Sequence, residues 1–238
     1  MIVSLSWLKR YVDFEMDAPE LALRLTNSLT EAEVVKPPWS GVEGVIAARV
    51  VTSEKHPDAD KLSVCIVDYG VGSSTVVCGA PNVRAGMMSV LAPPGATVAG
   101  GRTMSEANIR GRRSHGMLVS AMELGLEESS EGILELPSDV EPGADVISLL
   151  GLDDEQIELD VQPNRPDCLG MIGVAREVAA IVGGELRYPA VSLSEDGASA
   201  AELADVVIED AGGCPRYIAR VVRDLAVGPS PAWLQGCL

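Results

Sequence analysis

The hydrophobic pattern changes twice along the chain, and these changes constrain the fold more than any other feature of the sequence. Between Ser40 and about Leu150, short apolar runs alternate with turn residues, as in "KLSVCIVDYG", "STVVCGAPN" and "MMSVLAPPGA". This pattern is typical of short strands joined by turns. Five or six strands in about 110 residues, with one helical turn in "GMLVSAMELGL", predict a small barrel or sandwich, and an OB-fold fits.

The N-terminal flank of this region shows helical patterns instead. Asp17 precedes Pro19 and Glu20, an arrangement that predicts the capped start of a helix. Leucines four residues apart follow in "LALRLTNSL" and predict an apolar stripe on that helix. Shorter patterns predict a first helix in "SLSWLKRYV" and a strand in "EAEVVK".

The second flank begins after Gly151. Alternating apolar residues in "QIELDVQPNRPD" predict a strand, and "CLGMIGVAREVAAIVGG" predicts a helix that ends at the glycine pair. The two flanks together predict one discontinuous α/β domain, made of residues 1–39 and 151–190, with a domain of residues 40–150 inserted between them. The predicted fold class is α+β with several domains.

Residues 191–238 predict a linker followed by the opening of a further domain. The stretches "DVVIED" and "RYIARVVRDL" predict strands, and Ser230 with Pro231 predicts a helix start. Strands need neighbours and a helix of two turns needs packing partners. We therefore expect this segment to be the truncated start of a domain.

Composition limits the functions that the chain can have. The net charge is −17, and only 18 of the 238 residues are Lys or Arg. Because affinity for nucleic acids comes largely from positive charge, a general nucleic-acid-binding surface is excluded and only a local basic face is left. The N-terminus lacks the pattern of a signal peptide, and no apolar run approaches the roughly 20 residues of a membrane span.

The five cysteines form an odd set without a C-x-x-C pair. This usage predicts reduced, structural cysteines in a cytoplasmic protein. They are Cys65, Cys78, Cys168, Cys214 and Cys237.

The stretch "HPDADKL" places His56 near Asp58 and Asp60, which raises the question of a metal site. A metal site needs three or four converging ligands, whereas the chain has two histidines and no ligand spacing typical of such sites. Pro57 fixes one backbone angle, and the aspartates can bond back to nearby amide groups. The stretch therefore predicts a turn that leads into a strand at Lys61. Phosphate-binding glycine loops and nucleophile elbows are also missing, so we predict no catalytic residue and no metal ligand.

Candidate RNA-binding residues gather between residues 82 and 115. Five arginines lie there against one acid, Glu106, and the planar guanidinium suits paired hydrogen bonds to phosphate. The plainer alternative is a solvated positive strip. The loop "CGAPNVRAG" adds an asparagine that can reach a phosphate or a base, and a simple turn between strands explains this loop equally well. The candidate RNA-binding residues are Asn82, Arg84, Arg102, Arg110, Arg112, Arg113 and Ser114.

The stretch "NRPDCLG" precedes the second predicted helix of the α/β domain. Asn164 and Asp167 can cap the start of that helix, and a carboxylate can pin Arg165. A catalytic role would need a nucleophile beside a base, and no histidine is near. We therefore predict a capping turn.

Several of these segments occur in an order that resembles one family. They are "SLSWLKRYVD", "HPDADKLSVCIVDYG", "VVCGAPNVRAGM", "SHGMLVSAMELGL", "GILELP", "PNRPDCLGMIGVAREVAAI", "CPRYIARVV" and "PSPAWLQ". Each is short, but their order and spacing closely resemble the N-terminal part of the bacterial phenylalanyl-tRNA synthetase (phenylalanine–tRNA ligase) β subunit. The resemblance covers essentially the whole chain.

The resemblance implies a tRNA-binding OB-fold at residues 40–150, inserted into the α/β domain, and the truncated start of a B3/B4-type editing domain at residues 191–238. It implies a cytoplasmic α2β2 enzyme whose α subunit carries the synthetic site and whose substrate is tRNA(Phe). ATP and Mg²⁺ are implied for the whole enzyme, and no cofactor is implied for this chain, which should be inactive alone. Neither DNA nor a membrane is implied as a partner.

Three hypotheses follow. The leading one is an accessory tRNA-binding and assembly region of the ligase β subunit. A stand-alone tRNA-binding protein with an OB-fold is the second. The third is a purely structural docking region, in which the arginines pair with the many carboxylates of the chain.

Overall fold

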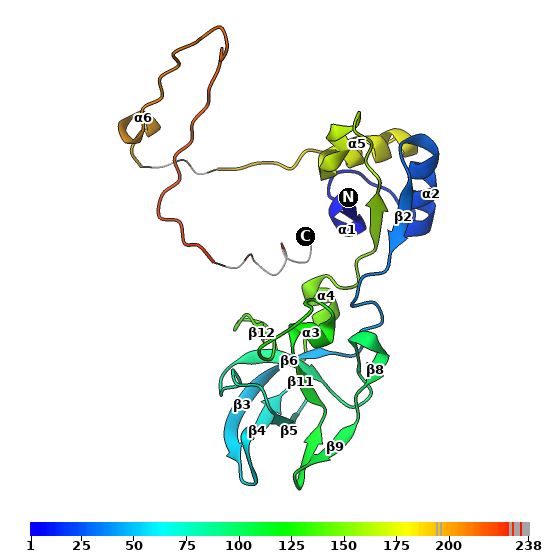
Figure 1. Cartoon of the computed structure of the whole chain (residues 1–238), viewed down its shortest axis with the longest axis vertical. Helices are drawn as coiled ribbons and strands as arrows, with labels where there is room; N and C mark the ends of the chain where they lie inside the picture. Colours follow the sequence, from blue (N-terminus) through cyan, green and yellow to red (C-terminus); the bar gives the residue numbers. More distant parts are fainter. Residues whose placement is uncertain (194, 196, 229, 231–233, 235–238) are drawn as a thin grey trace.

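The chain forms a small α/β unit, a β-rich unit and an extended C-terminal segment (Figure 1). The computed structural model describes residues 1–193, 195, 197–228, 230 and 234. The α/β unit comprises residues 1–36 and 156–187, and the β-rich unit comprises residues 42–150. All of the paired strands are antiparallel. The prediction of a mixed α+β protein is therefore confirmed.

The α/β unit is a three-stranded sheet in the order β1-β13-β2, with helices packed against it. Its central strand, β13, follows the β-rich unit in the sequence, so the sheet joins segments about 120 to 150 residues apart. The elements are β1 Ile2–Ser4, α1 Leu5–Leu8, α2 Ala18–Ser28, β2 Ala32–Val35, β13 Gln156–Leu159, the 3-10 helix η2 Pro166–Leu169 and α5 Met171–Val182.

Local sequence signals set most of these boundaries. Asp17 caps α2 as predicted, because its carboxylate accepts a hydrogen bond from the backbone N–H of Glu20 at 2.9 Å. Gly183 ends α5 in the left-handed conformation, at φ 67°. Helix α1 is shorter than predicted and spans one turn. The hydroxyl of Ser4 caps its start by accepting a hydrogen bond from the N–H of Trp7. The capping role predicted for Asn164 and Asp167 is wrong, because Asn164 precedes η2, Asp167 lies within η2, and the N-cap of α5 is Gly170.

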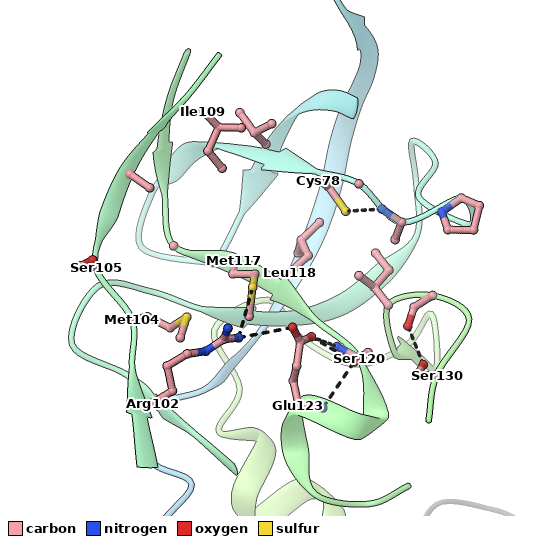
Figure 2. A pocket seen from close by; sticks show the side chains of 18 of the residues that line it. Cys78, Arg102, Met104, Ser105, Ile109, Met117, Leu118, Ser120, Glu123 and Ser130 are labelled. Atoms are coloured by element: carbon pink, nitrogen blue, oxygen red, sulfur yellow. Dashed lines mark hydrogen bonds and ion pairs between the residues drawn. The ribbon is translucent and has the colours of Figure 1, made fainter. Parts of the chain in front are cut away.

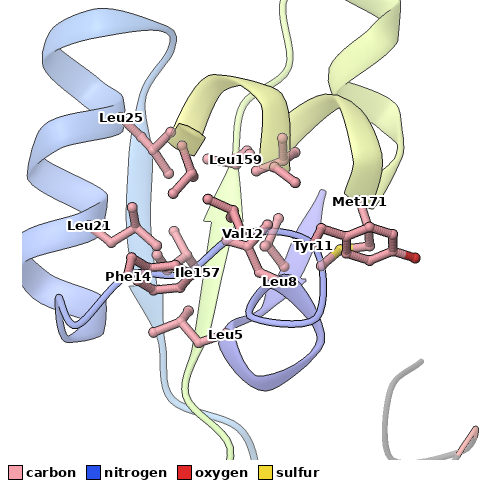
Figure 3. Packing of buried hydrophobic residues seen from close by; sticks show 14 of the residues in the cluster. Leu5, Leu8, Tyr11, Val12, Phe14, Leu21, Leu25, Ile157, Leu159 and Met171 are labelled. Carbon is pink, nitrogen blue, oxygen red and sulfur yellow. The ribbon is translucent and has the colours of Figure 1, made fainter. Parts of the chain in front are cut away.

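The core of the α/β unit is a single apolar cluster built from both flanks of the sequence (Figure 3). Leu21 and Leu25 from α2 face Ile157 and Leu159 from β13, and Leu8 fills the space beside them. All five side chains are at most 1% exposed. Full burial of a leucine or isoleucine contributes about 1.5–3 kcal/mol, so this cluster holds the two distant flanks together.

The β-rich unit is built on a six-stranded sheet in the order β11-β6-β3-β4-β5, with β12 paired to β6. Two short hairpins, β7–β8 and β9–β10, extend from it. Its strands are β3 Ile46–His56, β4 Ala59–Asp68, β5 Ser73–Cys78, β6 Met88–Ala92, β7 Thr97–Val98, β8 Arg102–Thr103, β9 Glu106–Ile109, β10 Arg112–His115, β11 Met117–Val119 and β12 Glu135–Leu136. Its helices are η1 Ala99–Gly101, α3 Ala121–Leu124 and α4 Val146–Leu150.

Two apolar clusters fill the β-rich unit. Strands β3 and β6 contribute to both clusters, because their residues are buried on both faces of the sheet. One cluster lies under α3 and α4, and the other lies between β4, β5 and β11. The core is aliphatic, as a chain with 3% aromatic residues requires.

The chain enters and leaves the β-rich unit at adjacent points. Ile46 and Asp145 form an isolated antiparallel bridge, and the backbone N–H of Val146 donates to the carbonyl of Val45 at 3.3 Å. The entering and leaving segments therefore form a narrow neck below the α/β unit (Figure 1).

The described residues between 188 and 228 run extended from the α/β unit, apart from the short helix α6 Ala200–Leu203 (Figure 1). The strands predicted in "DVVIED" and "RYIARVVRDL" are wrong for the described residues, which have no assigned strand there. A strand needs a hydrogen-bonded neighbour, and the sequence pattern alone cannot supply one. The helix start predicted at Pro231 lies outside the described residues. None of the helices that the described residues form has the length and apolarity that a membrane span requires.

Candidate nucleic-acid interface

The β9–β10 hairpin carries three of the five candidate arginines and points away from the α/β unit (Figure 1). Its turn consists of Arg110 and Gly111, with φ values of 50° and 81°. Two successive left-handed residues are typical of the tight turns whose twist matches that of paired strands. The sequence therefore places an arginine at the tip of the hairpin.

One face of the hairpin is neutralised by an acid. Residues directly opposite each other on paired strands share a face, so the pairs Glu106 with His115 and Asn108 with Arg113 lie together. The carboxylate of Glu106 accepts a hydrogen bond from Arg113 Nε at 2.9 Å and lies 2.9 Å from His115 Nδ1. The hydrogen bond from Arg113 is the main reason that the pKa of Glu106 lies below its ordinary value.

The opposite face carries Ala107, Ile109, Arg112 and Ser114. Ser114 is buried, and its hydroxyl accepts a hydrogen bond from the backbone N–H of Val77 in β5 at 3.0 Å. The same hydroxyl donates to the carbonyl of Gly116 at 2.9 Å. Ser114 therefore fastens the base of the hairpin to the sheet, and its hydroxyl is not exposed to a ligand.

The guanidinium groups of Arg110 and Arg112 are exposed to solvent. Both side chains belong to exposed residues, and neither has an ion pair or a side-chain hydrogen bond with any residue that the structure describes. These two guanidinium groups can therefore bind an external anion without first breaking a contact within the protein.

Two candidate residues from the "CGAPNVRAG" loop, Asn82 and Arg84, make contacts within the protein. The side-chain amide of Asn82 donates to the carbonyl of Ile133 at 2.9 Å and accepts from the backbone N–H of the same residue at 3.0 Å. Arg84 pairs with Glu135 and donates to the carbonyl of Asn82 at 3.4 Å. Asn82 thus holds the loop around residue 133, and this leaves little of its amide for a ligand.

Arg102 lies at the edge of a cavity rather than on the hairpin (Figure 2). Its guanidinium is 3.5 Å from Glu123 Oε1 and 3.9 Å from Met117 Sδ. Glu123 also completes the capping box of α3, where its other oxygen accepts from the N–H of Ser120 at 2.8 Å. The spacing of Ser120 and Glu123 is visible in the sequence, but their contact with Arg102 depends on the fold, and our sequence analysis missed it.

The stretch "HPDADKL" forms the tip of the β3–β4 hairpin, so the predicted turn is confirmed, but the strand that follows begins at Ala59 and not at Lys61. His56 is buried and holds the turn itself, because its Nδ1 accepts a hydrogen bond from the N–H of Asp58 at 3.1 Å. The residues that the structure describes contain no cluster of three or more His, Cys, Asp or Glu arranged to hold a metal ion.

In the α/β unit, Arg165 is pinned as predicted. It donates to Asp167 at 2.9 and 3.0 Å and to Glu177 at 2.6 Å. The hydrogen bonds from Arg165 lower the pKa of Asp167 to about 2. Burial raises the pKa of the adjacent Cys168 thiol, and a protonated thiol is a poor nucleophile. This cluster is therefore a structural clamp.

The β-rich unit matches a family of known domains. Residues 45–145 match the family described as "Putative tRNA binding domain". This range contains both hairpins, the cavity and all seven candidate residues.

Nearly the whole chain matches curated proteins of one kind. It is 50% identical over 98% of its length to the phenylalanine–tRNA ligase β subunit of Syntrophotalea carbinolica. The same subunit of Anaeromyxobacter dehalogenans is 49% identical over 98% of this chain, and that of Bacillus cereus is 42% identical over 99%. The chain spans 29% to 30% of the length of these relatives.

Among solved structures, the chain is also similar to the MetRS related protein from Pyrococcus horikoshii. That match has a TM-score of 0.32 and 22% identity, and it covers 42% of this chain and 85% of the other. This similarity is too low to support a conclusion. The curated relatives confirm the resemblance found in the sequence: over nearly its whole length, this chain is similar to an N-terminal part of the phenylalanine–tRNA ligase β subunit.

Proposed function

We propose that this chain is an accessory tRNA-binding and assembly region of a phenylalanine–tRNA ligase β subunit, and that the β9–β10 hairpin contacts the tRNA. The observation that carries the proposal is the pair of exposed arginines, Arg110 and Arg112, which have no acidic partner among the described residues. They lie inside the region that matches a tRNA-binding family. In a chain of net charge −17, two unpaired arginines on a projecting hairpin form a local site for phosphate.

The paired arginines take a secondary role in this proposal. The side chains of Arg84, Arg102 and Arg113 are 57%, 59% and 68% exposed. Exposed ion pairs contribute about 0–1 kcal/mol, so each of these arginines can exchange its carboxylate for a phosphate at little cost. RNA therefore meets Arg110 and Arg112 first and recruits the others as it approaches.

We further propose that the β-rich unit closes into an OB-fold barrel. The strand order β11-β6-β3-β4-β5 leaves only β5 and the β10–β11 segment to be joined. The hydrogen bond from the Val77 N–H to Ser114 Oγ lies at that junction. We propose the domain boundaries given by the sequence, with residues 40–150 inserted between 1–39 and 151–190. A shared sheet and core support the joining of the two flanks.

The relatives also suggest the partner, the substrate and the cofactors of the whole enzyme. Their name, phenylalanine–tRNA ligase β subunit, supports an α subunit as partner. The α2β2 assembly and the cytoplasmic location are proposed from the sequence resemblance alone. The substrate would be tRNA(Phe). ATP and Mg²⁺ would serve synthesis on the α subunit, and this chain alone would be inactive.

The test measures the affinity of the chain for tRNA(Phe) at several salt concentrations. Each phosphate contact contributes about 0.7–0.9 to the slope of log affinity against log salt. The double variant Arg110→Gln/Arg112→Gln should lower this slope by about 1.4–1.8 and weaken binding on the order of tenfold at low salt.

The matched control is Arg24→Gln/Arg176→Gln, which removes the same charge from exposed positions on α2 and α5. It should leave the slope within error of the unchanged chain. Equal effects of the two double variants would overturn the hairpin contact.

The ion pairs also favour a second candidate function, a structural docking region. Three of the five candidate arginines are paired with carboxylates in the structure. Under this alternative the chain binds tRNA weakly, without dependence on salt, and a pull-down of the α subunit succeeds without RNA. Salt-dependent binding that the hairpin variant abolishes would exclude it.

A further inference from the structure

A cavity of about 560 Å³ opens beside the β9–β10 hairpin (Figure 2). Its floor is apolar and consists of Val77, Cys78 and Leu118, each at most 6% exposed. Met104 and Met117 add polarisable sulfur atoms to the lining. The cavity therefore offers an apolar floor and the volume that small organic groups occupy.

A donor and an acceptor lie side by side at one end of this cavity. Glu123 Oε2 is occupied by Ser120, whereas Glu123 Oε1 has only the long 3.5 Å contact with Arg102. The guanidinium of Arg102 keeps further N–H groups free, because its side chain is 59% exposed. Such a pair complements a group that presents one N–H and one carbonyl or ring-nitrogen acceptor along the same edge.

The hairpin connects this cavity to the open arginines. Ala107 and Ile109 line the cavity, and Arg112 lies directly opposite Ile109 in the strand pairing. Arg112 therefore shares the face of the hairpin that borders the cavity. Glu131 also lines the cavity, and its charge disfavours a phosphate beside it. Arg102 already lies beside Glu123, so Arg112 is the cation of the adjoining hairpin face that has no carboxylate partner among the described residues.

This inference rests on the proposed tRNA contact. We infer that the cavity receives one unpaired nucleobase of the bound RNA, with the base edge toward Glu123 and Arg102 and its backbone phosphate toward Arg112. A nucleobase is flat, is apolar on its faces and carries adjacent donors and acceptors on its edge. An apolar protein side chain fits the floor but offers no acceptor to the remaining N–H groups of Arg102, which it would cover.

The test uses the full chain with ¹³C-methyl methionine and a short single-stranded RNA. A stacked base shifts the methyl resonances of Met104 and Met117 through its ring current. Met88, which is 1% exposed in the core, should not shift. The same RNA with abasic positions should bind with a similar dependence on salt but produce no methyl shift.

The matched variants are Ala107→Trp, which fills the cavity, and Asn108→Trp, which adds the same side chain to the other face of the same strand. Ala107→Trp should abolish the methyl shifts and weaken RNA binding on the order of tenfold, the lower range for loss of one stacked base. Asn108→Trp should preserve both. If Ala107→Trp fails to fold, Thr103→Trp fills the cavity from another exposed position.

Salt-dependent RNA binding without methyl shifts, or with equal shifts from the abasic RNA, would overturn the base site and leave the proposed hairpin contact intact. Equal RNA affinity in Ala107→Trp and Asn108→Trp would also overturn it. Absence of RNA binding by the unchanged chain would instead overturn both proposals.

Discussion

Arg165 in the α/β unit and Arg112 in the β-rich unit show two opposite settings of the same residue type. Arg165 is held by Asp167 and Glu177, and its side chain is 30% exposed. Arg112 lies on a projecting hairpin without a carboxylate partner among the residues that the structure describes. Both carry the same charge, so their difference comes entirely from what the fold places beside them.

The two arginines show how an acidic chain can keep a basic site. Carboxylates outnumber Lys and Arg by 35 to 18, and several exposed arginines, including Arg84, Arg102 and Arg113, form an ion pair with one of them. Arg112 departs from this because the acid of its hairpin, Glu106, lies on the opposite face and is occupied by Arg113 and His115. Strand alternation therefore separates Arg112 from the carboxylate of Glu106.

The strongest test of the comparison weakens the α/β core and asks whether RNA binding follows. Leu21 is fully buried, and Leu21→Ala should cost about 2–5 kcal/mol of the free energy of unfolding, because it leaves a cavity. Leu23→Ala on the same helix, at a position 63% exposed, should cost less than about 0.5 kcal/mol. Denaturant unfolding measures both values.

If the α/β unit only supports the hairpin, the folded Leu21→Ala protein should bind tRNA within about twofold of the unchanged chain, as expected for distant independent sites. A large loss of affinity in fully folded protein would place part of the RNA contact on the α/β unit.

A second test removes the ion pairs that Arg165 forms with Asp167 and Glu177. In Arg165→Gln the pKa of Asp167 should rise from about 2 toward its ordinary value of 3.8. Because the folded-state pKa lies below the unfolded value, the stabilisation from this pair is complete above about pH 4 and is lost as the pH falls toward 2. Carboxyl NMR titration measures the midpoint. The same midpoint in both proteins would show that Arg165 does not hold Asp167.

The smallest expected effect comes from the hairpin acid. Glu106→Gln releases Arg113 and should raise tRNA affinity about two- to fivefold, in line with the weakness of exposed ion pairs. The melting temperature should change little. Glu135→Gln, which releases Arg84 outside the hairpin, is the matched control, and equal gains from the two variants would argue against a special role of the hairpin.

Much of the fold follows from local signals. The cap at Asp17, the glycine stop at Gly183 and the turn at His56 all depend on residues within a few positions of one another. The joining of the two flanks was also predictable as a pattern, because a strand and a helix on each side of a β-rich insertion need a common core.

The candidate site was predicted less well, because its chemistry depends on contacts between distant residues. Ser114 is fastened to Val77, 37 residues away, and Asn82 to Ile133, 51 residues away. Nothing near Ser114 or Asn82 in the sequence reveals that its polar atoms are already used. The sequence located the arginine-rich stretch, but the hairpin and the separation of Arg112 from Arg113 onto opposite faces come from the strand pairing.

The bridge between Ile46 and Asp145 brings the entry and exit of the β-rich unit within hydrogen-bonding distance. A segment whose two ends touch can be excised and its cut points joined by a few residues, while the host sheet keeps its β13–β2 ladder. The host is therefore a natural acceptor for grafted modules: a foreign domain with adjacent termini could replace the β-rich unit at this position without stretching the scaffold.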